Sequence, residues 1–190
     1  MKFLIQDSSP QDTSTISSMC EQGFNPDSSD YDQRTALMVA AMKGNVDVIK
    51  KLLEYHCDPN LKDVHGTTAL MEATKNNHEE VCDVLLSHDA DLALSESEAA
   101  STLCQAVFDG DTMMLRRLLK AKILVNAGDY DKRTAAHIAA AESNHLALQV
   151  LVENGVDLSL KDRWGNTAAD EAKRVKAGKI IDYLISLEQE

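Results

Sequence analysis

The chain has 190 residues, of which 44% are hydrophobic and 4% aromatic, and its net charge is −12. This acidity disfavours direct binding to nucleic acids and to anionic membranes, which both attract basic surfaces. It serves solubility or complements a basic partner. We expect no signal peptide, because the apolar start turns polar at Gln6. We also expect no membrane insertion, because no apolar run approaches the ~20 residues of a membrane span.

Residues 1–29 keep only the second half of a pattern that later recurs in full. Ile16 stands 33 positions before Ile49, in a segment with the same helical spacing of apolar residues. The preceding stretch is rich in Ser, Gln and Asp. We therefore predict a half-repeat that caps the open end of an array, a common need in stacked repeats.

Residues 30–62 contain the first complete unit. A polar turn over 30–34 precedes Thr35, whose hydroxyl is typical of a helix N-cap. A short helix then ends near Gly44, and a second helix is predicted over residues 46–55. Helices this short are marginal alone, so packing between units must supply their stability.

Two motifs of this unit recur every 33 residues. A period in this range predicts a stacked array, in which each unit buries its apolar face against its neighbours. The first motif begins with a hydroxyl residue followed by small and apolar residues, at Thr35, Thr68, Ser101, Thr134 and Thr167. The second is an apolar pair, at Leu52-Leu53, Leu85-Leu86, Leu118-Leu119, Leu151-Val152 and Leu184-Ile185.

We predict four more units that form one continuous domain with the first. The unit over 96–128 is degenerate, because it opens with Ser and Glu residues and has no turn glycine. Its turn loop is expected to be shortened or absorbed into a helix. The last unit has a polar, basic outer surface that suits a C-terminal cap. The ranges are 63–95, 96–128, 129–161 and 162–190.

The recurring pattern resembles the ankyrin repeat from Thr35 to the C-terminus. That family has 33-residue units with a turn, the motif T-P-L-H-x-A, and a second helix ending in paired leucines. Here the proline is replaced in every unit, and the histidine is kept only as His137. The resemblance implies an all-α ankyrin-repeat solenoid of stacked helix-turn-helix units with β-turn fingers.

Three loop motifs make the resemblance more specific. They are DYDQRT from Asp30, DYDKRT from Asp129 and KDRWGNT from Lys161. They are similar to the cytosolic ankyrin domain of plant-type voltage-gated potassium channels, and similar runs occur in ankyrin tails of glutaminases and asparaginase-like enzymes. No pore signature or amidase core is present in the sequence. The resemblance therefore implies a regulatory or assembly role and no channel or amidase activity.

The residues that suggest enzyme chemistry have better structural explanations. His78-Glu79-Glu80 lacks the second histidine of a zinc helix, and His78 stands where a second ankyrin helix begins. His137 is expected to bond within the turn and helix start. Paired aspartates in the turns are typical turn formers. We expect no catalytic, cofactor-binding or metal-binding residues; the alternative, an unrecognised metal-dependent hydrolase, requires stoichiometric zinc.

The cysteines indicate a cellular compartment, and two asparagines indicate a possible modification. Four cysteines without C-x-x-C spacing are interpreted as buried, reduced thiols, which favours the cytoplasm. By resemblance to ankyrin arrays, Asn60 and Asn126 are hypothetical targets of an asparaginyl hydroxylase. The cysteines are Cys20, Cys57, Cys82 and Cys104.

The predicted function is non-enzymatic protein–protein interaction, as a scaffold or regulatory subunit. Its partner is an unidentified protein, and we expect a monomer unless the chain is part of a longer one. Trp164 either anchors a partner or packs on its own finger, and Met42 and Phe108 either form an apolar patch or pack between repeats. The predicted contacts lie on the concave face formed by fingers and first helices: Gln33, Arg34, Met42, Lys43, His65, Lys75, Phe108, Asp109, Lys132, Arg133, Glu142, Arg163 and Trp164.

Overall fold

The computed structural model describes residues 10–187, and every regular element in that range is an α-helix. The described helices fall into two compact units, residues 1–93 and 94–190. Unit 1 contains α1 (Pro10–Glu21), α2 (Ala36–Lys43), α3 (Val46–Glu54), α4 (Ala69–Lys75) and α5 (Glu79–Leu86). Unit 2 contains α6 (Glu96–Phe108), α7 (Thr112–Lys120), α8 (Ala135–Ala141), α9 (His145–Glu153), α10 (Ala168–Val175) and α11 (Gly178–Leu187).

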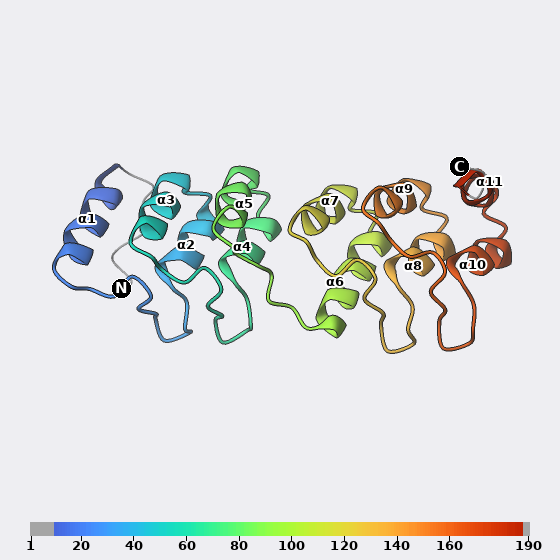
Figure 1. The fold of residues 1–190 in the computed structure, drawn as a ribbon, viewed down its shortest axis with the longest axis horizontal. Helices are drawn as coiled ribbons and strands as arrows, with labels where there is room; N and C mark the ends of the chain where they lie inside the picture. Colours follow the sequence, from blue (N-terminus) through green and yellow to red (C-terminus); the bar gives the residue numbers. More distant parts are fainter. Residues whose placement is uncertain (1–9, 188–190) are drawn as a thin grey trace. The chain divides into compact units, whose positions relative to one another are not determined.

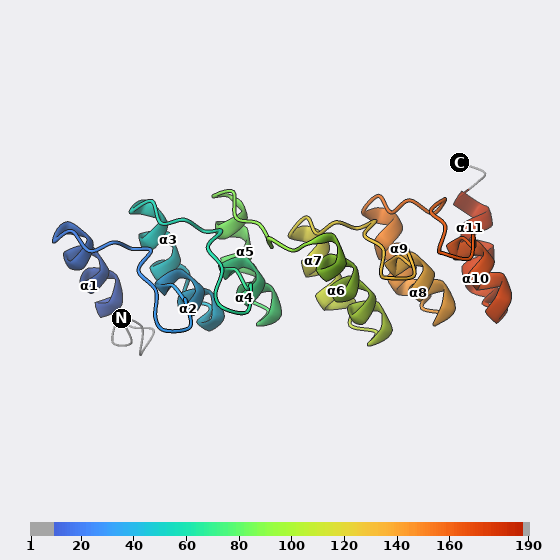
Figure 2. The ribbon, with the colours of Figure 1, turned by 90° about the horizontal axis from the view of Figure 1, so that it is seen from below.

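Helix pairs stack side by side within each unit, which confirms the all-α ankyrin solenoid fold. In unit 1, α2 packs on α3 and α4, and α3 packs on α1 and α5. In unit 2, α8 packs on α6, α9 and α10, and α9 also packs on α7 and α11. Figures 1 and 2 show the loops before α2, α4, α8 and α10 extending beyond the first helix of each pair. These loops are called fingers below.

Small residues allow the first helices to approach closely. Ala40 and Ala73 are fully buried between α2 and α4, as Ala139 and Ala172 are between α8 and α10. The first residue of each apolar pair on the second helices is buried, and Leu85 and Leu118 are fully buried. Each such leucine contributes roughly 1.5–3 kcal/mol by leaving water.

The helix ends follow the sequence expectations. The Thr35 hydroxyl accepts a hydrogen bond from the Met38 N–H, and Gly44 ends α2 in the left-handed conformation. His78 stands at the N-cap of α5, which confirms its structural role, and its Nε2 lies 3.1 Å from the Met42 carbonyl oxygen of the preceding repeat. A Cβ atom at Gly44 would lie only 2.5 Å from His78 Nδ1. The turn of one hairpin therefore fits tightly against the next.

The degenerate repeat has a helix in place of a finger, as its sequence predicts. The repeat register would begin the first helix at Thr102, but α6 begins at Glu96. Ser95 and Glu98 form a capping box, in which each side chain accepts from the other residue's backbone N–H. This cap explains why the Ser/Glu run is helical.

The predicted N-terminal half-repeat is only partly described. α1 supplies the expected helix, and Ile16 is buried. The part of the expectation that concerns residues 1–9 lies outside the described residues. Each predicted full repeat contains one helix pair, and the repeat boundaries and the single continuous domain remain predictions.

Candidate functional site

Four fingers share one turn built around an aspartate. In the first finger, Asp30 Oδ1 accepts from the N–H groups of Asp32 and Arg34, at 2.9 Å each. The Asp30 N–H also donates to the Arg34 carbonyl oxygen at 3.0 Å, which closes the loop. Asp63, Asp129 and Asp162 make the same pair of side-chain bonds at 2.8–2.9 Å. The turn-forming role predicted for the finger aspartates is confirmed, and each loop is held rigidly.

Each turn also needs one residue in the left-handed backbone region. Gly66 and Gly165 supply it in two fingers, with φ of 75° and 84°. Gln33 and Lys132 adopt the same conformation with φ of 59°, at some cost for a residue with a Cβ. The side chains of Gln33 and Lys132 are exposed.

Backbone hydrogen bonds lower the pKa of two turn aspartates, Asp30 and Asp162. The Arg34 N–H is the main cause at Asp30. At Asp162, burial is the largest influence and raises the pKa. The N–H groups of Asn166 and Trp164, the Asn166 side chain and His137 act against it, and the pKa is lowered there too. These carboxylates therefore stay ionised while they hold their loops.

In unit 1, two neighbouring fingers and the α2 and α4 helices enclose a cavity of about 300 Å³. Four predicted site residues line it, and Met38 and Val39 contribute apolar surface. Asp32 and Asp63 also line it. The predicted residues that the cavity brings together are Arg34, Met42, His65 and Lys75.

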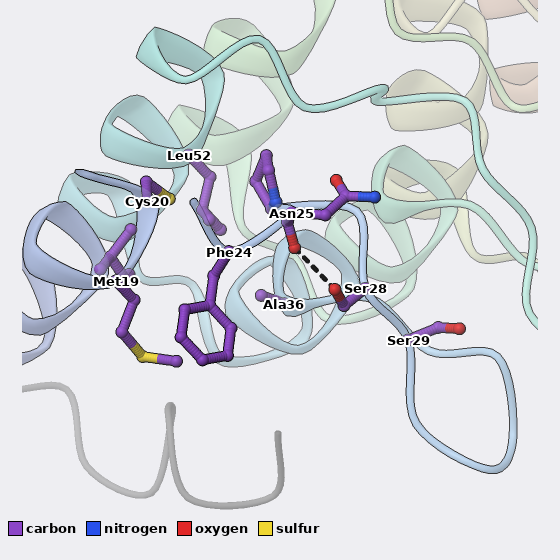
Figure 3. Close-up of a pocket in the computed structure, with 10 residues that line it drawn as sticks. Met19, Cys20, Phe24, Asn25, Ser28, Ser29, Ala36 and Leu52 are labelled. Atoms are coloured by element: carbon purple, nitrogen blue, oxygen red, sulfur yellow. Dashed lines mark hydrogen bonds between the residues drawn. The ribbon is translucent and has the colours of Figure 1, made fainter. Parts of the chain in front are cut away.

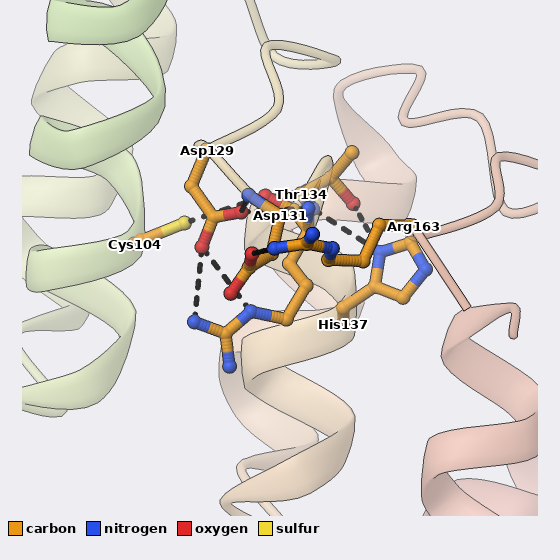
Figure 4. A network of polar contacts seen from close by, with 7 residues as sticks. Cys104, Asp129, Asp131, Thr134, His137 and Arg163 are labelled. Atoms are coloured by element: carbon orange, nitrogen blue, oxygen red, sulfur yellow. Dashed lines mark hydrogen bonds and ion pairs between the residues drawn. The ribbon is translucent and has the colours of Figure 1, made fainter. Parts of the chain in front are cut away.

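In unit 2, Arg163 joins the corresponding two fingers (Figure 4). Its guanidinium lies 2.7 Å from Asp131 Oδ1, and its backbone N–H donates to the Asp131 carbonyl oxygen at 2.8 Å. The same guanidinium lies 5.6 Å from the centre of the Tyr130 ring and 5.5 Å from the Trp164 ring. Trp164 is 63% exposed, so its contact with Arg163 leaves most of the indole open to a partner.

Two further polar groups, one around Thr134 and one around Asp129, lie next to Arg163 in Figure 4. His137 Nδ1 accepts from the Thr134 backbone N–H at 3.2 Å, so Nε2 carries the proton and donates to the Asn166 carbonyl oxygen at 3.1 Å. This confirms the expected role of His137 in the turn and helix start. Arg133 pairs with Asp129 at 3.0 Å and is half-buried.

The remaining predicted contacts lie at the ends of first helices. Lys43 and Phe108 are the last residues of α2 and α6, and Asp109 and Glu142 cap the ends of α6 and α8. All four side chains are exposed. Met42 and Phe108 belong to different units, so the predicted patch between them stays a prediction.

A second cavity, of about 240 Å³, lies between α1 and the loop that follows it (Figure 3). Met19, Cys20 and Phe24 line its apolar side, and Ser28 Oγ donates to the Asn25 carbonyl oxygen at 2.7 Å. No pattern in the sequence indicates this cavity, because it depends on how α1 meets the first full repeat.

The cysteines differ in burial from the expectation. Cys57 and Cys82 are buried, but Cys20 and Cys104 are half-buried. Burial raises the pKa of Cys57 to about 12 and that of Cys104 to about 11, and none of the four cysteines is in a disulfide.

The two asparagines hold neighbouring loops together. Asn60 Oδ1 accepts from the Asp91 N–H at 2.8 Å, and its Nδ2 donates to the Asp89 carbonyl oxygen at 3.0 Å. Asn126 Oδ1 accepts from the Asp157 N–H at 2.8 Å. Their hydroxylation remains a hypothesis.

The described residues were also searched for groups of metal-ligating side chains and for helices that could span a membrane. Within residues 10–187, no group of three or more His, Cys, Asp or Glu side chains is arranged to hold a metal ion. In the same part of the chain, no helix has the length and apolarity to cross a membrane.

The fold and its fingers agree with comparisons to known proteins. The model of the family "Ankyrin repeats (3 copies)" matches residues 4–96 and 103–190. The chain belongs to the ankyrin-repeat family. Ankyrin repeats are protein-interaction modules, and the family match confirms the resemblance that the sequence motifs indicated.

Relatives and solved structures extend this result. Over 169 residues, 89% of this chain, it is 54% identical to potassium channel KOR2 of Oryza sativa subsp. japonica, of which it spans 23%. It is 37% identical over 80 residues, 42% of this chain and 13% of the relative, to the mitochondrial liver glutaminase of Rattus norvegicus. The crystal structure of the ankyrin repeat domain of Bcl-3 aligns with a TM-score of 0.72 and 26% identity, covering 90% of this chain and 76% of that one.

Proposed function

We propose that this ankyrin domain is a non-enzymatic scaffold or regulatory module that binds a protein partner through its fingers and first helices. The observation that carries the proposal is the combination of rigid turns and exposed side chains on the fingers. The aspartate bonds fix each loop, and Tyr130, Trp164 and Arg163 lie at exposed positions on two of them. Aromatic and arginine side chains on a rigid support lose little entropy when they bind.

The proposal includes a cytoplasmic location, a monomeric domain and no direct contact with nucleic acid. The net charge of −12 supports the last point, because phosphate binding needs basic surface. Four cysteines that form no disulfide support a reducing compartment.

Affinity capture with the purified chain tests the proposal. Trp164→Ala and Arg133→Glu alter the fingers. Met113→Ala and Arg116→Glu are matched controls on the second helix α7, because Met113 is also exposed and Arg116 also pairs with a carboxylate. Captured proteins are identified by mass spectrometry, purified and rebound for a dissociation constant. We expect finger variants to weaken binding at least tenfold and the controls to change it less than twofold; equal effects on both faces would reject the proposed surface.

A second candidate is a regulatory or assembly domain of a potassium channel. The 54% identity with KOR2 over 89% of this chain favours it. In that case the partner surface belongs to another part of the channel. The parent transcript decides the matter: a pore-forming segment in the same reading frame supports this candidate, and a complete transcript without one rejects it.

A further inference from the structure

Two pairs of fingers in this chain repeat each other at a distance of 99 residues. The sequence DYDQRT at 30–35 corresponds to DYDKRT at 129–134, and DVHGTT at 63–68 corresponds to DRWGNT at 162–167. Both pairs are joined in the same way. The Val64 N–H donates to the Asp32 carbonyl oxygen at 3.0 Å, as the Arg163 N–H does to Asp131 at 2.8 Å. Each unit therefore contains the same finger pair with different side chains.

In unit 2, an arginine from the chain itself completes this arrangement. The Arg163 guanidinium pairs with Asp131 and lies near the faces of Tyr130 and Trp164. Charge-assisted pairing and cation–π attraction act on the same group. The paired Asp131 side chain is 27% exposed.

In unit 1, Val64 stands where unit 2 has Arg163. The equivalent carboxylate, Asp32, is 50% exposed and pairs with Arg34, which contacts its Oδ2 at 3.2 Å and also pairs with Asp30. Tyr31, the counterpart of Tyr130, is 99% exposed. Unit 1 thus keeps the carboxylate and one of the two aromatic rings of the arginine site. It has His65 in place of Trp164 and no arginine at the position of Arg163.

Resting on the proposed function, we propose that unit 1 binds an arginine side chain of a basic, extended segment in its protein partner. The guanidinium pairs with Asp32 and stacks on Tyr31, in the arrangement that Arg163 has in unit 2. The segment continues into the adjacent 300 Å³ cavity, where Glu72 adds a further carboxylate and Met42 an apolar surface.

Charge supports this partner over an acidic one. Residues 1–93 carry sixteen acidic and seven basic side chains, a net charge of −9, whereas residues 94–190 carry fifteen and twelve, a net charge of −3. Arg34 and Lys75 line the cavity as well, and the same lining holds three carboxylates: Asp32, Asp63 and Glu72. Arginine fits better than lysine, because its planar guanidinium both stacks on rings and pairs with carboxylates.

A labelled peptide tests the proposal on the complete chain. The probe is fluorescein-labelled (Arg-Gly-Ser)₄, compared with versions in which every arginine is lysine or glutamine. Fluorescence anisotropy is measured at about 150 mM salt, where distant surface charges are largely screened. We expect the arginine peptide to bind at least fivefold more tightly than the lysine peptide and the glutamine peptide not to bind. Equal affinity for the arginine and lysine peptides, or no arginine binding below about 1 mM, overturns the proposal.

Matched variants locate the site. Asp32→Asn and Val64→Arg are each expected to lower the affinity for the arginine peptide about tenfold. The first removes the carboxylate, and the second supplies an arginine from the chain itself. Tyr31→Ala is expected to lower this affinity about threefold. Asp131→Asn and Tyr130→Ala make the same changes in unit 2 and are expected to change affinity less than twofold. Circular dichroism melting checks that every variant is folded.

The outcomes separate this inference from the function on which it rests. If Asp32→Asn and Asp131→Asn lower the affinity for the arginine peptide equally, the peptide is attracted only by the overall charge. The proposed arginine site at Asp32 is then rejected. The finger-dependent capture of a protein partner would then still stand. If capture itself does not depend on the fingers, the proposed function fails independently of the peptide result.

Discussion

At one position of the repeat, different residue types occupy the same place at the start of the first helix. The position that holds histidine in the ankyrin motif is Met38, Met71, Cys104, His137 or Asp170 here. His137 and Asp170 both accept hydrogen bonds at the start of their helices. Met38 and Met71 are buried and fill the space with apolar volume. A motif defined by one residue type would therefore miss most of these units.

His137 should be important for stability because it bonds on both sides. Replacing it with alanine leaves the Thr134 N–H and the Asn166 carbonyl oxygen without these partners and opens a cavity. We expect the free energy of unfolding to fall by roughly 2–3 kcal/mol, measured by urea denaturation. Cys104 holds the equivalent position in the preceding repeat and is only half-buried. Cys104→Ala is therefore the control and should cost clearly less; an equal loss would contradict the role of the two histidine bonds.

The left-handed turn residues allow a second test. Gly165→Ala places a Cβ at φ of 84°, with no atom within 4 Å of it, so the cost is backbone strain alone. We expect a loss of about 1 kcal/mol in a urea titration. Gly178→Ala, where the backbone is helical and the space is also open, should not destabilise the protein. A loss of the same size at both glycines would count against the strain argument.

At the scale of elements, the 33-residue period predicted most of the helices. The hydroxyl caps at Thr35 and Thr68 and the breaker at Gly44 are local signals, so the first helices could be located from sequence. The sequence also indicated that the turn loop before α6 is shortened or becomes helical, and the capping box of Ser95 and Glu98 that starts this helix is a local feature. The Arg163 contacts could not be predicted, since they depend on how two fingers pair and which rotamer bridges them. The half-burial of Cys104 likewise depends on its approach to Arg133, whose carbonyl oxygen lies 4.0 Å from Sγ.

Packing between helix pairs can be tested at α5. Leu85 is fully buried, so Leu85→Ala should lower the free energy of unfolding by roughly 2–5 kcal/mol through lost burial and a cavity. Leu86 is its neighbour on the same helix but is only half-buried. Leu86→Ala should therefore cost less than half as much in the same denaturant experiment. A wild-type midpoint for Leu85→Ala would show that the helix phase is wrong.

At the scale of the whole molecule, four aspartates with a lowered pKa predict sensitivity to acid. The folded-state pKa of Asp30, Asp157, Asp162 and Asp170 is lowered. A lowered pKa contributes stability above the unfolded-state value of about 4, and this stability is lost as the pH falls through the folded-state value. We expect the urea midpoint to fall steadily below about pH 4.

A single amide substitution should change that pH profile. Asp162→Asn keeps an oxygen that accepts from the Trp164 and Asn166 N–H groups, so the finger can still form. It removes the ionisable carboxyl, and the fall of the urea midpoint below about pH 4 should become shallower than in the wild type. An unchanged slope would mean that the acid transition arises elsewhere.

The close fit of Gly44 against the imidazole of His78 ties two neighbouring repeats together. Any side chain at position 44 collides with a ring that already bonds to the carbonyl group of Met42. Position 44 can therefore enlarge only if position 78 shrinks, and the two sites must vary as a pair. Engineering that exchanges one of these repeats for another has to carry both residues across together, although they lie in different repeats.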